Sequence, residues 1–207
     1  MSRSKSSKRW LQEHFDDYYV KKSQEEGFRS RAVYKLIELD EREKLLKPGI
    51  TVIDLGAAPG GWTQYVSQRL DGQGSIIALD ILPMDAMADV TMITGDFQEQ
   101  EVFDKLLQIC PDKGVDLILS DMAPNMSGNP AVDIPRAMGL AELAMDLCSS
   151  VLKHGGTLVM KVFQGEGFEN ILAVARKQFT RVSMRKPKAS RPRSREVYLV
   201  AKGYKMV

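Results

Sequence analysis

Charged side chains stand at the ends of five successive apolar runs of the sequence. They are Asp54, Asp80, Asp96, Asp121 and Lys161. If the runs are parallel strands, their carboxyl ends meet at one edge of a sheet, where open α/β sheets bind their ligands. Carboxylates there can hold hydroxyl, amino or cationic groups, and a lysine beside them can serve as a base. Together these residues predict a functional site at that edge.

A turn of small residues follows the first of these aspartates. The stretch TVIDLGAAPGGWTQYV passes from an apolar run through glycine, alanine and proline into a helical pattern. Glycine removes the side chain that would keep a ligand from the backbone. Gly56, Ala58 and Gly61 have the spacing of a dinucleotide fingerprint, with alanine in the middle place. A nucleotide-like cofactor is the favoured interpretation, and a tight strand-to-helix turn without a ligand is the alternative.

The acidic residues distinguish between two cofactors that contain a ribose. Asp80 lies 24 residues beyond Gly56, close to the spacing at which a carboxylate binds ribose hydroxyls. NAD and S-adenosylmethionine both offer this ribose, but neighbouring carboxylates repel a pyrophosphate and attract a sulfonium with its amino acid group. Asp96 is placed to receive the adenine amino group. S-adenosylmethionine is therefore expected, with a nicotinamide oxidoreductase as the alternative.

Cysteine and histidine chemistry is not indicated. Cys110 and Cys148 fall in helical patterns, whereas cytosine C5 methylation needs a cysteine in a loop at a strand end. His14 and His154 are far apart and have no cysteines around them, so we expect neither a metal site nor a histidine triad. Amino-group methylation usually has an Asn/Asp-Pro-Pro-aromatic loop after the fourth strand, and here that loop reads Asp-Met-Ala-Pro.

The elements that must position these residues alternate between strands and helices. The strand-like runs are 51–54, 75–80, 90–94, 115–120 and 156–162. Helical stripes of apolar residues lie between them, and this alternation predicts parallel βαβ units in a doubly wound sheet. Two further strands, 181–186 and 195–202, follow without a helix between them and predict a hairpin with one antiparallel strand. A helix over 30–46, with Ser30 as its N-cap, is expected ahead of the sheet.

Charge is distributed unevenly along the 207 residues. Residues 1–35 carry nine Lys and Arg against five Asp and Glu, residues 181–207 carry nine against one, and the segment between them has a net charge of −10. Basic ends on an acidic body predict a polyanionic partner, most simply nucleic acid. No apolar stretch approaches the ~20 residues of a membrane span. We expect a disordered basic tail over 1–8 and one domain over 9–207, in a monomeric cytoplasmic protein.

A set of ordered motifs extends from about Arg9 to the end of the chain. These motifs are DLGAAPGGWTQ, ALDILPM, GDF, SDMAPNMSG, VDIPRA, VMKVFQGEG and SREVYLVA. They resemble the FtsJ/RrmJ-type 2'-O-ribose methyltransferases, heat-shock enzymes that act on bacterial large-subunit ribosomal RNA. The resemblance implies a class I methyltransferase (Rossmann-like) α/β fold with a doubly wound, mostly parallel sheet of seven strands. The C-terminal hairpin would supply the one antiparallel strand.

The resemblance also implies a reaction and the residues that perform it. A methyl group of S-adenosylmethionine would pass to the ribose 2'-hydroxyl of a uridine in the A loop of 23S ribosomal RNA, in an assembled or late-assembling 50S subunit. The implied catalytic tetrad is Lys35, Asp121, Lys161 and Glu196. The implied cofactor contacts are Gly60, Trp62, Asp80, Asp96 and Asp121.

Elementary chemistry assigns a role to each member of the tetrad. Methyl transfer from a sulfonium is an in-line displacement, which depends mainly on alignment. The ribose hydroxyl must also lose its proton, and Lys161 is assigned as the base, positioned by Asp121 and Lys35. Glu196 is expected to orient Lys35 or the hydroxyl. Trp62 is expected to wall the cofactor pocket, with core packing alone as the alternative.

Two basic segments are expected to contact the RNA. Arg191, Arg193 and Arg195 lead directly to Glu196, so their phosphate contacts would deliver the ribose to the tetrad. The stretch NMSGNPAVDIPRA reads as a long loop that could close on an unstacked nucleotide through Arg136. A non-catalytic RNA-binding module that has kept the fold remains an alternative to the enzyme.

Overall fold

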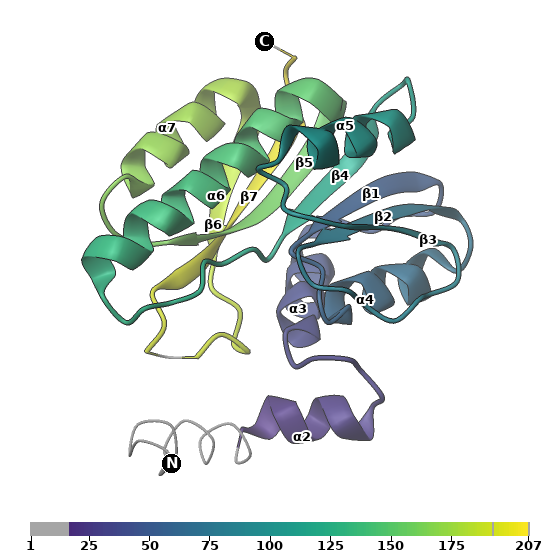
Figure 1. Ribbon diagram of the computed structural model, residues 1–207, viewed down its shortest axis with the longest axis horizontal. Coiled ribbons are helices and arrows are strands. Elements are labelled where there is room, and N and C mark those ends of the chain that lie inside the picture. Colours follow the sequence, from purple (N-terminus) through teal and green to yellow (C-terminus); the bar gives the residue numbers. More distant parts are fainter. Residues whose placement is uncertain (1–16, 192, 207) are drawn as a thin grey trace.

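The computed structural model describes residues 17–191 and 193–206, so the tail expected over 1–8 lies outside the described residues. Seven strands form a single sheet (Figure 1). They are β1 (Ile50–Leu55), β2 (Gly74–Asp80), β3 (Val90–Thr94), β4 (Val115–Ser120), β5 (Leu152–Phe163), β6 (Phe179–Arg185) and β7 (Glu196–Tyr204). Their order across the sheet is β3-β2-β1-β4-β5-β7-β6. The chain adds β2 and β3 on one side of β1 and then returns to add β4 and β5 on the other side.

Helices cover both faces of the sheet. They are α2 (Tyr18–Glu25), α3 (Val33–Glu43), α4 (Gly61–Leu70), α5 (Gln100–Ile109), α6 (Pro130–Val151) and α7 (Phe168–Gln178). In Figure 1, α5, α6 and α7 lie on one face, α3 and α4 lie on the other, and α2 lies beyond α3. Within the described ranges, no helix has the length and apolar content needed to cross a membrane.

The direction of the strands agrees with the sequence prediction. Strand β1 runs parallel to β2 and β4, and β4 runs parallel to β5. Strand β7 is antiparallel to both of its neighbours, β5 and β6. The expected doubly wound, mostly parallel sheet of seven strands with one antiparallel strand is therefore confirmed. Because β7 runs in the opposite direction, its first residue, Glu196, lies beside the last residue of β5, Phe163.

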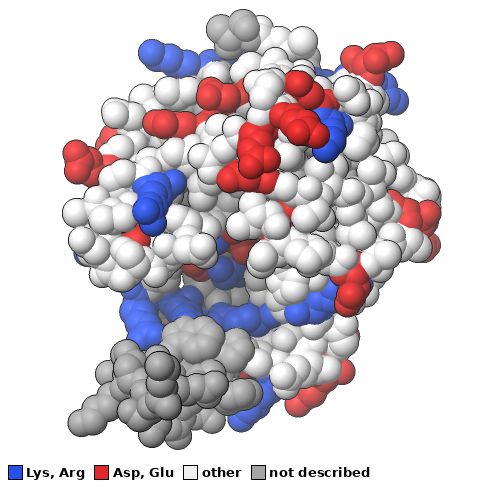
Figure 2. Space-filling model, in the orientation of Figure 1, with Lys and Arg blue, Asp and Glu red and all other residues white. Residues whose placement is uncertain are grey.

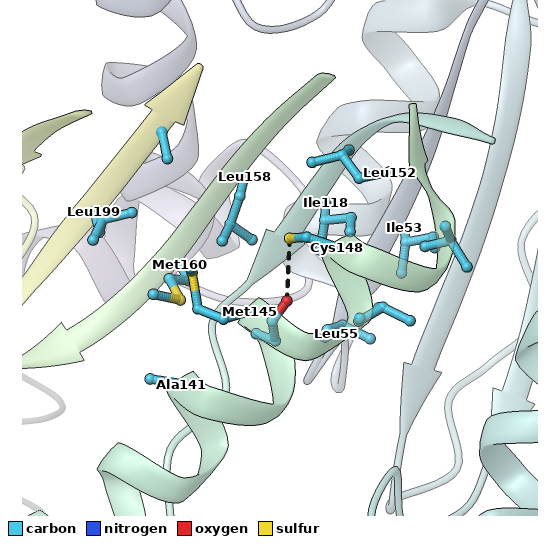
Figure 3. Packing of buried hydrophobic residues seen from close by; sticks show 14 of the residues in the cluster. Ile53, Leu55, Ile118, Ala141, Met145, Cys148, Leu152, Leu158, Met160 and Leu199 are labelled. Atoms are coloured by element: carbon cyan, nitrogen blue, oxygen red, sulfur yellow. Dashed lines mark hydrogen bonds between the residues drawn. The ribbon is translucent and has the colours of Figure 1, made fainter. Parts of the chain in front are cut away.

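The sheet is buried on both faces, which explains the nearly continuous apolar runs of its central strands. Ile53 belongs to the core under α5, α6 and α7, whereas its neighbour Val52 belongs to the core under α3 and α4. Helix α6 packs Met145 and Cys148 against the first of these cores (Figure 3). Burial raises the pKa of the Cys148 thiol to about 12, so this thiol is not a reactive nucleophile.

The leading helix is shorter than expected. Helix α3 covers Val33–Glu43 rather than 30–46, and Ser30 is not its N-cap, because the cap position is taken two residues later. At the other end, the buried carboxylate of Asp40 accepts a hydrogen bond at 2.8 Å from the backbone N–H of Leu45. Lys44, which has a φ of 53°, caps the end of the helix, and the Asp40 bond holds the chain that follows. The sequence pattern did not reveal this helix end, because the apolar periodicity continues past it.

The segment expected to be a loop, NMSGNPAVDIPRA, is helical from Pro130 onwards, which corrects that expectation. The Asn129 side chain caps α6, and proline is well suited to the first turn of a helix because its missing N–H has no partner there. The Asp133 carboxylate accepts the backbone N–H of Ser127 at 2.8 Å and fixes the residues before the helix. Arg136 therefore lies on a helix rather than on a long loop.

Several other boundaries differ by a few residues; β6 begins at Phe179 rather than at 181, and β7 ends at Tyr204 rather than at 202. Strand β5 begins at Leu152 rather than at 156, because Leu152 pairs with Val115 before a shift of register. Cys110 follows α5 as its C-cap rather than lying inside a helix, and burial raises the pKa of its thiol to about 11. None of these differences moves a residue of the expected site.

Candidate active site

The turn between β1 and α4 is shaped by glycine and held by Asp80. Gly56 has a φ of 73°, and a side chain there would come within 2.8 Å of Met122 Cγ in the loop after β4. The Asp80 carboxylate accepts the backbone N–H of Ala58 and that of Leu82, both at 2.8 Å. Glycine thus lets the loops after β1 and β4 approach each other, and Asp80 connects the loops after β1 and β2.

A cavity of about 800 Å³ opens beyond the carboxyl ends of β1, β2 and β4. Three of the predicted cofactor residues line it, namely Asp80, Asp96 and Asp121. Ile81 and Leu82 also line it, and both are more than half exposed. Pockets of this size with a few convergent polar groups suit a ligand of nucleoside dimensions.

The charges of this cavity fit a cationic ligand better than a pyrophosphate. Its lining contains three carboxylates, and Arg136 is the basic residue among them. Asp54 lies behind the turn, is fully buried, and accepts a hydrogen bond from the Thr63 hydroxyl at 2.6 Å. Its second oxygen, Oδ1, has no hydrogen-bond partner among the described residues. Burial, followed by the charges of Asp121 and Asp80, raises the pKa of Asp54 to about 7.

Gly60 and Trp62, the other two predicted cofactor residues, are not part of the cavity lining. Gly60 has a φ of 105°, and a side chain there would come within 3.0 Å of the Arg29 side chain. Trp62 is 3% exposed, and its indole N–H donates to the backbone oxygen of Ala32 at 2.8 Å. Trp62 thus joins α4 to the start of α3, and its contact with a cofactor stays a prediction.

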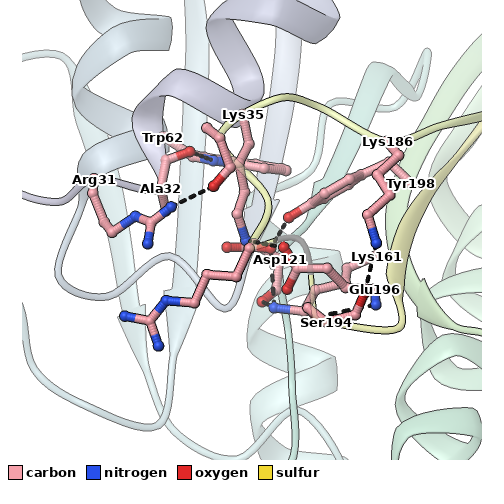
Figure 4. Close-up of polar contacts among 12 residues, drawn as sticks. Arg31, Ala32, Lys35, Trp62, Asp121, Lys161, Lys186, Ser194, Glu196 and Tyr198 are labelled. Carbon is pink, nitrogen blue, oxygen red and sulfur yellow. Dashed lines mark hydrogen bonds and ion pairs between the residues drawn. The ribbon is translucent and has the colours of Figure 1, made fainter. Parts of the chain in front are cut away.

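The four residues of the expected tetrad come together at the same edge of the sheet (Figure 4). The Lys161 ammonium donates to the backbone oxygen of Asp121 at 2.6 Å and to its carboxylate at 3.0 Å. The Lys35 ammonium lies 2.7 Å from the Glu196 carboxylate. The four side chains are between 8% and 17% exposed, so both ion pairs are largely shielded from water.

The strand register explains this assembly. Lys161 on β5 is directly opposite Tyr198 on β7, so both side chains leave the sheet on the same face. Tyr198 packs in the core under α3 and α4, and this is the face from which Lys35 reaches the site. Glu196 is two residues before Tyr198 and therefore shares that face.

Tyr198 is a site residue that the sequence analysis missed. Its hydroxyl donates to the Asp121 carboxylate at 2.6 Å, and its ring lies 5.8 Å from that of Trp62. The available signal was its spacing from Glu196, since alternate residues of a strand share a face. Because a tyrosine in a strand usually serves packing, the spacing alone did not mark it.

Both carboxylates of the tetrad are held in the ionised form. Burial alone would raise the pKa of Asp121, but the ammonium groups of Lys161 and Lys35 and the Tyr198 hydroxyl outweigh burial and lower it. Burial would likewise raise the pKa of Glu196, and Lys35 outweighs it. The tetrad is thus a compact arrangement of two cations and two anions.

A second cavity, of about 1110 Å³, lies on the other side of the tetrad. Its lining includes Lys35, Lys161 and Glu196, and Ala123 lines both cavities. Four arginines stand around it: Arg31, Arg191, Arg193 and Arg195. Figure 2 shows Lys and Arg side chains gathered around a hollow in the lower half of the view. Arg136 lines the first cavity, so the structure does not place it among these arginines.

Arg31 holds the loop between β6 and β7 against the rest of the site. Its guanidinium donates to the Asp17 carboxylate and to the backbone oxygen of Ala189. Arg191 lies 3.8 Å from the same carboxylate. The loop that carries the arginines is therefore fixed beside α3, on which Lys35 stands.

The described residues contain no group of three or more His, Cys, Asp or Glu side chains that could hold a metal ion. The chain is similar in structure to a ribosomal RNA methyltransferase from Plasmodium falciparum. The TM-score is 0.78 at 33% sequence identity, over 86% of this chain and 98% of the other. This places the chain in the class of Rossmann-like α/β methyltransferases. A fibrillarin pre-rRNA processing protein of Methanococcus jannaschii, with a TM-score of 0.58 at 17% identity, shares the fold alone.

The sequence narrows this class to one family. The model of the FtsJ-like methyltransferases matches residues 28–204, and the chain belongs to this family. It is 61% identical over 206 residues to a protein of Legionella pneumophila (strain Corby) named Ribosomal RNA large subunit methyltransferase E, with 100% of both chains covered. A protein of the same name from Hahella chejuensis is 61% identical over 205 residues, 99% of this chain and 100% of its own. The resemblance indicated by the motifs is therefore confirmed.

Proposed function

We propose that this methyltransferase transfers the methyl group of S-adenosylmethionine to the ribose 2'-hydroxyl of a uridine in the A loop of 23S ribosomal RNA. One observation carries the proposal. The Lys-Asp-Lys-Glu tetrad lies between an acidic cavity and a cavity surrounded by arginines. The names of the relatives support large-subunit ribosomal RNA as the substrate. The uridine follows from the resemblance to the family.

The acidic cavity is the proposed cofactor site. Asp80 would bind the ribose hydroxyls, Asp96 the adenine amino group, and Asp121 the positively charged amino acid part. When bound, the cofactor supplies an electrophilic methyl group. Ile81 and Leu82 would cover the adenine from solvent, since they are exposed apolar residues of the cavity lining.

Lys161 is the proposed base, and the other tetrad residues position it. In its neutral form, Lys161 would accept the proton of the 2'-hydroxyl. Asp121 fixes the Lys161 nitrogen through two hydrogen bonds, of 2.6 and 3.0 Å. Glu196 holds Lys35 in the lining of the second cavity, where Lys35 would contact the ribose. The alignment of the hydroxyl with the methyl group is then set by groups that are already ordered.

The basic cavity is the proposed RNA site. The four arginines around it would contact phosphates and bring one unstacked nucleotide to the tetrad. An assembled or late-assembling 50S subunit is the proposed substrate, and the protein would act as a cytoplasmic monomer.

The chemistry can be tested on ribosomal RNA from cells that lack this protein. After incubation of their large subunits with the protein and S-adenosylmethionine, one A-loop uridine should gain a methyl group and become resistant to alkaline cleavage on its 3' side. A 2'-O-methyl group blocks the attack of that hydroxyl on the phosphate, whereas a base methyl group does not. A methyl group at a nucleotide that still cleaves normally would show base methylation and refute the proposal.

A further inference from the structure

Gln164 is a polar residue of the basic cavity whose backbone is fixed while its side chain is exposed. It follows β5 directly, three residues after Lys161. Its backbone N–H donates to the backbone oxygen of Arg195 at 3.1 Å. The ladder between β5 and β7 thus continues past the Phe163–Glu196 pair and fixes the position of Gln164. Its side-chain amide makes no hydrogen bond within the part of the chain that the structure describes.

Apolar side chains line the same cavity as this amide. Met126, Ile134 and Phe163 line it together with Gln164, and Met126 is 55% exposed. Ile134 packs over Gly165, where an added Cβ would lie 2.9 Å from its Cδ1 atom. The cavity therefore combines apolar walls and one amide next to the tetrad. This is the composition of a site for a planar group with a polar edge.

We propose that Gln164 binds the Watson–Crick edge of the target base while Met126, Ile134 and Phe163 contact its faces. This inference rests on the proposed ribose methylation, because the base must enter the cavity with its ribose at the tetrad. Bases that are splayed out of RNA are recognised by contacts to their faces and by hydrogen bonds to their edges. Uracil presents the N3–H donor beside the O4 acceptor, and a carboxamide offers an acceptor and a donor in one plane. Gln164 is thus a residue that contacts the substrate base.

The arginines and the tetrad do not offer the acceptor and donor pair that this edge of uracil matches. The arginines carry donors only and match phosphates, and the tetrad residues are engaged in ion pairs with each other. Glu166, the next acidic residue, is not part of the cavity lining. Among the described residues, Gln164 is the one carboxamide side chain in the lining of this cavity.

A double-mutant cycle tests the proposal, with one substitution in the protein and the other in the target base. Large subunits are reconstituted with ligated RNA that carries either the target uridine or difluorobenzene ribonucleoside, an apolar mimic of its shape. The wild-type protein should methylate the mimic with a kcat/KM roughly ten- to hundredfold lower, because the hydrogen bonds to the base are lost. Gln164→Leu should lose a similar factor on uridine and discriminate little between the two nucleotides, because the two changes remove the same interaction.

The controls separate this role from a general effect on the protein. Gln108→Leu, at an exposed position of α5, should behave as the wild type on both substrates. Titration calorimetry should show the cofactor affinity of Gln164→Leu within twofold of the wild type, because Gln164 does not line the acidic cavity.

Two results would overturn the inference while leaving the proposed function intact. In one, Gln164→Leu methylates uridine within twofold of the wild type. In the other, the effects of the two substitutions multiply independently, which would mean that Gln164 does not bind the base. If the wild type transfers no methyl group to the uridine ribose at all, the proposed function fails, and this inference fails with it.

Discussion

At the scale of single residues, the two lysines of the site differ in their surroundings. Lys161 is held by the backbone oxygen and the carboxylate of Asp121, whereas Lys35 is held by the Glu196 carboxylate; both lysines line the basic cavity. Asp121 also accepts the Tyr198 hydroxyl and lines the acidic cavity. Lys161, which lines the basic cavity, thus lies beside a residue that lines the acidic cavity, and this supports its assignment as the base.

Replacing Lys161 with alanine should abolish turnover and leave the fold in place. Loss of a general base typically lowers the rate by about 10² to 10⁴. In this variant the Asp121 carboxylate still accepts the Tyr198 hydroxyl and is still stabilised by the positive charge of Lys35, so its own charge remains compensated. Single-turnover methylation measures the rate, with Lys105→Ala on the exposed surface of α5 as the control. A rate within threefold of the wild type would exclude Lys161 as the base.

Replacing Asp80 with alanine should weaken cofactor binding. A charge-assisted hydrogen bond contributes ~1.5–3 kcal/mol, which corresponds to roughly a 10- to 150-fold loss of affinity. Calorimetric titration with S-adenosylmethionine measures this loss. Asp80→Asn tests whether the charge or the support of the turn matters, because Asp80 also accepts the N–H groups of Ala58 and Leu82. Unchanged affinity in the alanine variant would contradict the proposed cofactor site.

Asp54 should make the stability of the protein depend on pH. Its folded-state pKa of about 7 lies above its ordinary value, so between about pH 4 and pH 7 the folded state keeps a proton that the unfolded state has lost. The contribution of Asp54 to stability is therefore present at low pH and is lost as the pH rises through 7. A tenfold difference in proton affinity between the folded and unfolded states corresponds to about 1.4 kcal/mol of stability.

The comparison with Asp54→Asn isolates this effect. Urea unfolding at several pH values should show the wild type losing free energy of unfolding, relative to the variant, as the pH rises from 4 to 7. Carboxylates with lowered pKa values, such as Asp121 and Glu196, act in the opposite direction below their ordinary range, and both proteins contain them. Parallel stability curves would show that Asp54 is ionised in the folded state throughout.

At the scale of elements, the position of α3 relative to the sheet determines where Lys35 lies. The Trp62 indole donates to Ala32 just before α3, and its ring packs beside that of Tyr198. Arg31, next to Ala32, binds the loop between β6 and β7. Helix α3 is therefore attached to α4 and to the loop that carries the arginines, and its Lys35 pairs with Glu196 of β7.

Replacing Trp62 with phenylalanine should lower turnover more than cofactor affinity. The substitution removes the hydrogen bond to Ala32, which contributes about 1 kcal/mol, and loosens the start of α3. Because Trp62 does not line the acidic cavity, calorimetry should give a cofactor affinity within twofold of the wild type. A large loss of affinity with unchanged turnover of the bound cofactor would instead identify Trp62 as a wall of the cofactor pocket.

At the scale of the whole molecule, the two charged regions of the sequence serve different cavities. The aspartates of the acidic middle segment line the first cavity, and the arginines from both basic segments surround the second. Segments far apart in the sequence meet there, since Arg31 and Arg195 belong to opposite ends of the chain. The small net charge of +2 conceals this separation.

Replacing Arg195 with alanine should weaken RNA binding and reduce its dependence on salt. One phosphate contact contributes about 0.7–0.9 to the slope of log affinity against log salt concentration. Filter binding to large-subunit RNA at several salt concentrations measures the slope, and Arg176→Ala on α7 is the matched exposed control. Cofactor affinity should not change. An unaltered slope would show that Arg195 contacts no phosphate.

The order of motifs and apolar runs along the chain was sufficient to predict the fold, the family and the proximity of Lys35, Asp121, Lys161 and Glu196. Strand-length apolar runs that end in Asp54, Asp80 and Asp121 specify a buried parallel sheet and its ligand edge, because these signals are local in the chain. The two strands at 181–186 and 195–202, with no helix between them, indicated the antiparallel strand for the same reason.

Contacts between residues far apart in the chain depended instead on how whole elements pack. The Tyr198–Asp121 bond joins residues from β7 and the loop after β4, and no local pattern encodes that distance. The same holds for Arg136, which the helical turn of α6 directs into the acidic cavity rather than toward the arginines. Side-chain partners depend on the packing of helices against the sheet, and periodicity in the sequence reports only the face on which a residue lies.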